Sequence, residues 1–258
     1  MAFALVTGSS GGIGLCIAKE LASRKYDLLL VARSETKLKS IQEEIQNQYS
    51  VFVKYLVCDL SQTNASGKVI EWATSFDIQI VVNNAGFGIW GNLEQNNPAD
   101  LHQLMQLNQV VLMELCKGFI PYLKKRLDNS YILNIGSTAA YQAVPGMAVY
   151  SASKAFVVSF TRALRWELKD TRISVTCFSP GTTTTGFMDR ALMDDVMKQK
   201  AEKVTMKAED VARIGVKGMF AGKAEVIPGF VNWISVKMVS FVPKFLTETI
   251  AYNLYRQK

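Results

Sequence analysis

Short aliphatic runs alternate along the chain with longer segments in which apolar residues recur every three or four positions. The short runs predict buried strands, and the longer segments predict helices with one apolar face. We expect strands at residues 3–7, 27–32, 51–57, 78–83, 131–135, 173–179 and 225–227. We expect helices at residues 13–24, 35–48, 65–74, 99–125, 149–169 and 208–220.

This alternation predicts an α/β fold, namely a single Rossmann-type, doubly wound domain with a seven-stranded parallel sheet flanked by helices. No composition shift, Gly/Ser-rich linker or internal repeat divides the chain, so one domain over residues 1–258 is expected. Residues 182–204 begin with threonines and continue with Met and charge. We expect this irregular segment to form a substrate lid.

Composition narrows the classes of function. The 258 residues carry a net charge of +7, but Lys and Arg are scattered along the chain, which argues against nucleic acid as a partner. The longest uncharged C-terminal run, residues 226–236, is too short to span a bilayer, and the start of the chain lacks the features of a signal peptide. The single histidine, His102, is expected at the surface or an interface, and no metal site is predicted. Four separated cysteines suggest reduced thiols in the cytoplasm: Cys16, Cys58, Cys116 and Cys177.

A glycine-rich turn follows the first expected strand and leads into the first helix. Its sequence is Thr7-Gly8-Ser9-Ser10-Gly11-Gly12-Ile13-Gly14. Glycines let a backbone turn tightly and approach a pyrophosphate, whose charge the free N–H groups and the helix dipole then meet. The spacing differs from the commoner G-x-G-x-x-G, and an ordinary tight turn is the alternative. The candidate dinucleotide-binding residues here are Gly8, Ser10, Gly12, Ile13 and Gly14.

The second expected strand ends in Ala32-Arg33-Ser34. A carboxylate at this point binds the ribose 2′-hydroxyl of NAD, whereas an arginine accommodates the 2′-phosphate of NADP. Arg33 offers a bidentate guanidinium, and Ser34 offers a hydroxyl that could instead cap the next helix. NADP(H) is therefore the expected cofactor, with NAD(H) less favoured. A solvated arginine at the entry of a helix is the alternative reading of Arg33.

Further motifs follow in order along the chain. Asp59-Leu60 comes after the third expected strand, Asn83-Asn84-Ala85-Gly86 ends the fourth, and Pro180-Gly181 follows the sixth. Tyr150 and Lys154 form a Y-x-x-x-K, with Ser137 upstream at the end of the fifth strand. Asn108 lies in Leu107-Asn108-Gln109 on the fourth expected helix. With these motifs the chain resembles the short-chain dehydrogenase/reductase family over most of its length.

The resemblance implies catalytic roles for Asn108, Ser137, Tyr150 and Lys154, with Asn108 holding a water that relays protons to Lys154. Taken alone, Asp59 could be a helix cap, the segment after Asn83 could be a plain turn, and the register of the threonines could slip by one. The cofactor contacts that the resemblance implies are Asp59, Leu60, Asn84, Ala85, Gly86, Tyr150, Lys154, Pro180, Gly181, Thr183 and Thr185.

The chemistry explains why these residue types are needed. Reducing a carbonyl requires a hydride on carbon and a proton on oxygen, and a tyrosine hydroxyl ordinarily has a pKa of about 10. Tyr150 and Lys154 stand at i and i+4, on one face of a helix, and the ammonium is expected to lower the pKa of Tyr150. Ser137 is expected to hydrogen-bond the substrate oxygen and to stabilise the developing alkoxide.

The sequence thus predicts an oxidoreductase that transfers a hydride between NADP(H) and a carbonyl or secondary alcohol. The other hypothesis is a non-catalytic NADP(H)-binding sensor or interaction protein on the same fold, against which the intact catalytic set argues. Apolar residues near the motifs suggest an apolar ketone or aldehyde, of the 3-oxoacyl, steroid or xenobiotic kind. These candidate pocket residues, each with core packing as its alternative, are Phe87, Trp90, Tyr141, Phe187, Met188 and Met193.

The C-terminal extension, residues 230–258, mixes aromatic, aliphatic and basic side chains and is divided by Pro243. It could close over the substrate pocket, pack against a second subunit or rest on a membrane surface as a peripheral contact. The family resemblance implies a homodimer or homotetramer, whose interfaces would use the helices expected at residues 99–125 and 149–169.

Overall fold

The computed structural model describes residues 2–193, 199, 205–239 and 241–255. Within these residues one parallel sheet has the strand order β3-β2-β1-β4-β5-β6-β7. Except at the edge strand β3, the apolar strand residues are buried on both faces, as the aliphatic runs indicated. The predicted seven-stranded, doubly wound sheet is confirmed. The strands are β1 (Phe3–Thr7), β2 (Asp27–Ala32), β3 (Val53–Val57), β4 (Ile78–Asn83), β5 (Ser130–Ile135), β6 (Ile173–Phe178) and β7 (Glu225–Val226).

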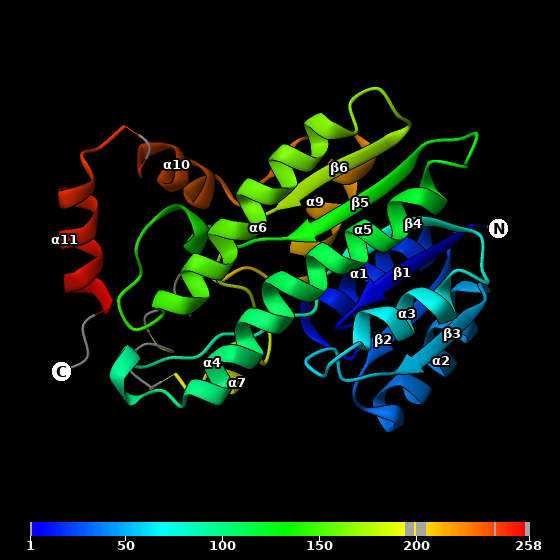
Figure 1. Ribbon diagram of the computed structural model, residues 1–258, viewed down its shortest axis with the longest axis horizontal. Coiled ribbons are helices and arrows are strands. Elements are labelled where there is room, and N and C mark those ends of the chain that lie inside the picture. Colours follow the sequence, from blue (N-terminus) through cyan, green and yellow to red (C-terminus); the bar gives the residue numbers. More distant parts are fainter. Residues whose placement is uncertain (1, 194–198, 200–204, 240, 256–258) are drawn as a thin grey trace.

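Helices cover both faces of the sheet (Figure 1). On one face, α1 (Gly12–Ser23), α2 (Glu35–Tyr49) and α9 (Ala208–Phe220) bury their apolar sides in one core cluster. On the other face, α3 (Ala65–Ala73), α5 (Val111–Leu123) and α6 (Ala148–Glu167) do the same. Because the chain leaves β1 toward β2 on one side and later returns to β4 on the other, a crevice forms at the carboxyl ends of β1 and β4.

The helix expected at residues 99–125 is interrupted. The chain forms α4 (Pro98–Met105), then a π-helical turn, η2 (Gln106–Val110), and only then α5. The apolar spacing continues through the turn, which is why the sequence predicted one helix. The wider π turn buries Asn108 to 1% exposure.

The expected lid contains a short helix, α7 (Phe187–Arg190), and Thr183 forms an isolated parallel bridge with Met206. The remainder of the predicted lid, at residues 194–198 and 200–204, lies outside the described residues. Two short 3₁₀ segments, η1 (Leu93–Gln95) and η3 (Thr138–Tyr141), follow β4 and β5.

The C-terminal extension folds into two helices, α10 (Phe230–Val239) and α11 (Lys244–Tyr255). Figure 1 shows them at one end of the molecule, far from β3 and beyond the carboxyl end of β6. Among the described residues, no helix combines the length and the apolar character needed to cross a bilayer.

Candidate active site

A cavity of about 860 Å³ opens at the carboxyl ends of the strands. It gathers residues that lie far apart in the sequence, and most of the residues predicted for the site line it. They are Gly8, Ser10, Gly12, Ile13, Gly14, Arg33, Asp59, Leu60, Asn84, Ala85, Gly86, Ser137, Tyr150, Lys154, Pro180, Gly181, Thr183 and Thr185. Ser34 and Asn108 are absent from this lining.

The glycine-rich turn forms one wall of the cavity. Gly8 and Gly12 have φ values of 65° and 55°, a left-handed conformation that glycine adopts without strain. A Cβ on Gly14 would stand 2.4 Å from Asn84 Nδ2 and 2.5 Å from Gly8 O, so no larger residue fits there. No side chain caps the first turn of α1, and no acidic residue lies in it. Its N–H groups and dipole are therefore available to an anion, which fits a pyrophosphate.

The Asn84–Gly86 segment is fastened to this turn. Asn84 Nδ2 donates to the carbonyl oxygens of Thr7 and Gly8 at 2.9 and 3.1 Å. In return, Thr7 Oγ1 accepts from the backbone N–H groups of Asn84 and Ala85 at 3.0 and 3.1 Å. These hydrogen bonds consequently hold the glycine-rich turn and the segment after β4 together as one wall of the cavity.

Charged side chains gather where β2 and β3 end. Arg33 lines the cavity, whereas Ser34 is the N-cap of α2 and accepts from Lys37 N at 3.4 Å. Burial by itself would raise the pKa of Asp59, but hydrogen bonds from Ser61 and the positive charge of Arg33 lower that pKa below its ordinary value. Asp59 is therefore ionised at neutral pH and bound to the loop that follows it.

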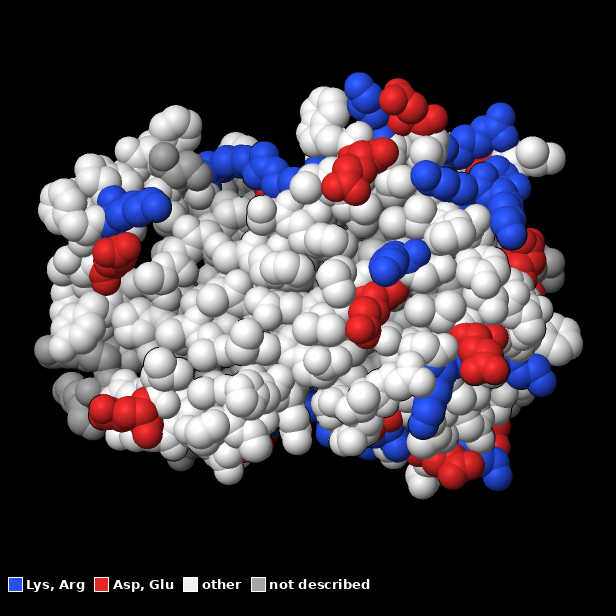
Figure 2. Space-filling view, in the orientation of Figure 1, with Lys and Arg blue, Asp and Glu red and all other residues white. Residues whose placement is uncertain are grey.

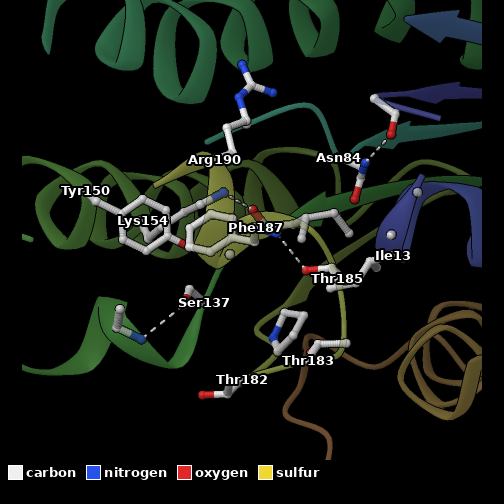
Figure 3. Close-up of a pocket in the computed structure, with 18 of the residues that line it drawn as sticks. Ile13, Asn84, Ser137, Tyr150, Lys154, Thr182, Thr183, Thr185, Phe187 and Arg190 are labelled. Atoms are coloured by element: carbon white, nitrogen blue, oxygen red, sulfur yellow. Dashed lines mark hydrogen bonds between the residues drawn. The ribbon is translucent and has the colours of Figure 1, made fainter. Parts of the chain in front are cut away.

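Tyr150 and Lys154 project from α6 into the cavity, as the i, i+4 spacing predicted (Figure 3). Lys154 Nζ lies 5.9 Å from the centre of the Tyr150 ring and donates to Ile135 O at 2.8 Å. Burial lowers the pKa of Lys154 to about 8. Burial also raises the pKa of Tyr150 to about 12, and a hydrogen bond with Ser137 offsets this only in part. The expected lowering of the tyrosine pKa is therefore wrong for this structure, because desolvation raises that pKa more than the hydrogen bond with Ser137 lowers it.

Ser137 begins η3 directly after β5. Its Oγ accepts from Ala139 N at 3.1 Å, and this hydrogen bond fixes the direction of the side chain. Since Ser137 also hydrogen-bonds Tyr150, the two hydroxyls face the same part of the cavity. A substrate oxygen placed there would meet two hydroxyl donors.

Asn108 lies behind the cavity, not on its surface. Asn108 Oδ1 is 2.9 Å from where a Cβ on Gly86 would stand, and Lys154 Nζ is 3.5 Å from the same point. The absence of a side chain at Gly86 therefore leaves the amide and the ammonium close together. Asn108 Nδ2 also donates to Ser153 Oγ at 3.0 Å, which joins the π turn to α6.

The threonine loop after β6 closes the cavity from another side. Thr185 approaches the glycine-rich turn, with its Cγ2 3.1 Å from where a Cβ on Gly12 would stand. Thr185 Oγ1 accepts from Phe187 N at 3.2 Å and so begins α7. Gly181 lies close to α10, because a Cβ at Gly181 would come within 2.6 Å of Asn232 Nδ2.

The outer part of the cavity is largely apolar, and four of the six predicted pocket residues line it: Tyr141, Phe187, Met188 and Met193. The placement of the other two was wrong. Trp90 is 8% exposed in a satellite core, and the Phe87 ring packs 4.7 Å below the guanidinium of Arg190. Phe87 and Trp90 both belong to the loop after β4, where no strand or helix period fixes the direction of a side chain.

Several lining residues were not foreseen from the sequence. Lys37 and Arg190 bring additional positive charge to the cavity, and α10 and α11 supply Asn232, Val236 and Tyr255. In Figure 3 the guanidinium of Arg190 points away from Tyr150 and Lys154. Burial lowers the pKa of Arg190, as does the nearby charge of Arg33, while Asp59 opposes the effect. The only sequence signal for Arg190 was its place in the expected lid, and for Asn232, Val236 and Tyr255 it was their place in the extension.

Fold and site together define a dinucleotide-binding oxidoreductase, and the comparisons agree. The family model of the short chain dehydrogenases matches residues 2–196. A very-long-chain 3-oxoacyl-CoA reductase of Anas platyrhynchos is 32% identical over 254 residues, which cover 96% of this chain and 80% of that protein. An NADP-dependent 3-hydroxy acid dehydrogenase of Schizosaccharomyces pombe is 33% identical over 221 residues, covering 81% and 85%.

The fold of a solved relative matches as well. A short-chain dehydrogenase from Sphingobium yanoikuyae, in complex with NADPH, superposes with a TM-score of 0.83 at 27% identity, covering 93% of this chain and 94% of that one. The chain belongs to the short-chain dehydrogenase family. The resemblance inferred from the ordered motifs is confirmed.

Proposed function

We propose that this protein is an NADP(H)-dependent oxidoreductase that interconverts a carbonyl and a secondary alcohol. The observation that carries the proposal is the convergence of Ser137, Tyr150 and Lys154 on the cavity formed by the glycine-rich turn. NADPH, when bound, supplies the hydride. The non-catalytic sensor is not favoured, because a protein that only binds the cofactor does not need this proton-donating pair of hydroxyls.

NADP(H) fits the charges at the adenosine end of the cavity. Arg33, Lys37 and Arg190 line it, with Asp59 as the acidic side chain among them. A 2′-phosphate would be bound by Arg33 and, across the site, by the lid residue Arg190. Asp59 and Leu60 would form the adenine pocket, and the glycine-rich turn would hold the pyrophosphate. The relative from Sphingobium yanoikuyae, in complex with NADPH, supports the same cofactor here.

Tyr150 is the proposed proton donor. Because burial raises its pKa to about 12, the hydroxyl is protonated at neutral pH, which is the form that carbonyl reduction requires. Ser137 orients the substrate oxygen beside it. Lys154 holds the ribose of the cofactor and supplies positive charge, and Asn108 positions Lys154 through the π turn and the backbone of Gly86.

The proposed substrate is an apolar ketone or aldehyde, and a 3-oxoacyl compound fits best. Met188, Met193 and Phe187 form an apolar and adaptable wall next to Tyr150, with the Phe187 and Tyr150 rings 5.3 Å apart. The relative from Anas platyrhynchos is named for a 3-oxoacyl-CoA substrate, and the relative from Schizosaccharomyces pombe for a 3-hydroxy acid. Steroid-like and xenobiotic carbonyls are the other members of the class to test.

The chain is proposed to form one domain over residues 1–258, with residues 182–204 as the lid, and to assemble as a homodimer or homotetramer. The face of α5 and α6 supports the assembly. Phe156 and Trp166 are 36% and 73% exposed there, and Figure 2 shows few charged side chains over the centre of this face. A cytoplasmic location is proposed because Cys16, Cys58, Cys116 and Cys177 are all free thiols.

The test is the loss of NADPH absorbance when the protein is mixed with 3-oxoacyl-CoA esters of increasing length, ketosteroids and aldehydes. Tyr150→Phe should reduce turnover roughly 10²–10⁴-fold, because it removes the proton donor and little of the packing. NADPH affinity, measured by fluorescence, should stay within a few-fold of wild type. Turnover that survives in Tyr150→Phe would refute the assignment of the proton donor.

A further inference from the structure

The outer surfaces of α10 and α11 are apolar. Of the twenty-one large hydrophobic side chains that are exposed among the described residues, eleven lie between Phe230 and Leu254. Phe241 is 84% exposed and Phe230 is 74% exposed. A surface of this kind is uncommon on a protein that meets only water, and it marks a contact with something apolar. The other nine residues are Val231, Trp233, Ile234, Met238, Phe245, Leu246, Ile250, Tyr252 and Leu254.

The helical spacing places these side chains away from the domain. On α10 and just beyond it, Phe230, Ile234, Met238 and Phe241 follow each other at intervals of four, four and three residues, which is one face of a helix. The single buried residue of α10, Val236, lies on the opposite face and lines the cavity. The apolar stripe is therefore turned outward, the reverse of a helix that packs on its own core.

We propose that α10 and α11 rest on the surface of an anionic lipid bilayer, and that an apolar substrate enters the cavity from the lipid. The composition of the two helices favours lipid over a second protein chain. Trp233, Phe241 and Tyr252 provide the amphipathic and bulky rings that insert at the headgroup level, with Lys237 and Lys244 among them.

Charge selects the kind of lipid. Residues 230–258 contain Lys237, Lys244, Arg256 and Lys258 against a single acidic residue, Glu248, so their net charge is +4 − 1 = +3. Basic residues next to an inserted apolar surface are attracted to anionic headgroups. Figure 2 shows the apolar character of this surface, because the end of the molecule formed by α10 and α11 is mostly uncharged on this face, whereas charged side chains crowd the opposite end.

The geometry of these helices favours lying on the bilayer over spanning it. α10 has 10 residues and α11 has 12, which correspond to about 15 and 18 Å of helix, against about 30 Å of hydrocarbon. Pro243 lies between them and lets each helix follow the surface separately.

The same two helices connect this surface with the cavity. Leu254 is 47% exposed and also lines the cavity, next to Tyr255. An apolar molecule could therefore pass from the outer surface to the wall near Phe187 and Met193 along apolar side chains. This route for the substrate rests on the proposed function, whereas the bilayer contact stands on the exposed surface alone.

The experiment is flotation of the full chain with vesicles of phosphatidylcholine, either pure or with 30% phosphatidylglycerol by composition. We expect the wild type to float with the anionic vesicles and to bind the pure phosphatidylcholine vesicles at least tenfold more weakly. The double variant Phe241→Glu with Phe245→Glu should bind the anionic vesicles at least tenfold more weakly than the wild type. Neither residue lines the cavity.

The matched control is Phe52→Glu, which makes the same kind of substitution at the opposite end of the molecule. The Phe52 side chain is 65% exposed, a fraction similar to the 67% of Phe245. It should float like the wild type. Wild type that stays in the lipid-free fraction, or a double variant that still floats, would overturn the proposal. So would a lipid-free dimer, seen by sedimentation, that the double variant converts to monomer.

Binding of NADPH, followed by fluorescence in the same samples, separates the two proposals. Flotation without NADPH binding would contradict the proposed function and leave the bilayer contact supported. NADPH binding and turnover without flotation would contradict the bilayer contact alone. Far-UV circular dichroism of each variant checks that a loss of binding is not a loss of folding.

Discussion

Asn108 and Phe87 are joined by a reciprocal pair of hydrogen bonds: Phe87 N donates to Asn108 Oδ1 at 3.1 Å, and Asn108 Nδ2 donates to Phe87 O at 3.0 Å. With the further bond to Ser153, both amide hydrogens of Asn108 are used. The side chain therefore fixes the loop after β4, and a water relay to Lys154 would depend on the remaining acceptor capacity of Asn108.

We predict that Asn108→Ala lowers the free energy of unfolding by about 2–4 kcal/mol, because it leaves the backbone groups of Phe87 without partners. Turnover should fall with it as Lys154 loses its support. The comparison is Ser153→Ala, which leaves the Phe87 pair intact but removes the hydrogen bond from Asn108 and the one that Ser153 Oγ donates to Tyr150 O, and it should cost about 1–2 kcal/mol. Chemical denaturation measures both values, and equal losses would contradict the special role of the Phe87 pair.

Gly14 and Gly11 offer a second test within one turn. Gly14→Ala should destabilise the protein by about 1–3 kcal/mol and reduce NADPH binding, since its Cβ would collide with Asn84 and Gly8. Gly11→Ala should be tolerated, because no atom lies within 4 Å of the added Cβ and the φ of 169° is extended. Thermal unfolding and NADPH titration of the two variants would decide, and similar behaviour of both would show that the close approach is unimportant.

The two arginines at the adenosine end should control the choice of cofactor. Arg33→Ala is expected to weaken NADPH binding roughly 10- to 100-fold and to leave NADH binding nearly unchanged, because a charge-assisted hydrogen bond to the 2′-phosphate is lost. Arg190→Ala should show the same selectivity to a smaller extent. Calorimetric titration with both cofactors measures the effect, and equal losses for NADPH and NADH would remove the residue concerned from the 2′-phosphate site.

The lowered pKa of Lys154 leads us to predict that activity depends on pH. As the pH rises through about 8, the buried ammonium loses its proton, and the affinity for NADPH should decline. Tyr150 stays protonated over this range because its pKa is about 12, so the turnover number should change less than the Michaelis constant for NADPH. Steady-state kinetics from pH 6.5 to 9.5 would test this, and a turnover number that falls first would point to Tyr150 instead.

The free energy of unfolding should rise with pH over the range in which the affinity for NADPH declines. The pKa of Lys154 is lowered from 10.5 in the unfolded chain to about 8 in the folded one, so between these values the unfolded state binds more protons. The cost of burying the charge is complete below pH 8 and is lost as the pH rises toward 10.5. Relative to Lys154→Met, the wild type should gain about 2 kcal/mol between pH 7 and 9.5. A constant difference in urea denaturation would contradict the lowered pKa.

The sheet could be predicted from the sequence because most of its strands are short runs rich in aliphatic residues and bounded by polar turns, most plainly at Leu28–Val31. The site could be predicted because parallel strands bring their carboxyl ends together. Arg33, Asp59 and Ser137 each follow a strand, so the fold places them at one edge whatever the intervening helices do.

The remaining parts of the site could not be predicted, because no comparable rule of strand order places their side chains. The outward stripe of α10 reverses the usual amphipathic pattern, so its apolar residues were not recognised as one helix. Arg190 reaches the cavity through α7, and Asn232 reaches it by packing on Gly181, and both contacts depend on tertiary placement. The raised pKa of Tyr150 depends on how deeply the hydroxyl is buried, which the spacing to Lys154 does not reveal.

The π turn at Gln106–Val110 also has a meaning for the history of the chain. Compared with a regular α-helix, it holds one extra residue, as if a single codon had been inserted into a continuous helix. Removing that residue would rotate α5 by about 100° relative to α4, and at least one of the two helices would lose its packing partner. An insertion or deletion in this turn should therefore disrupt the packing of α4 or α5, whereas the same change in a surface loop should have little effect on the fold.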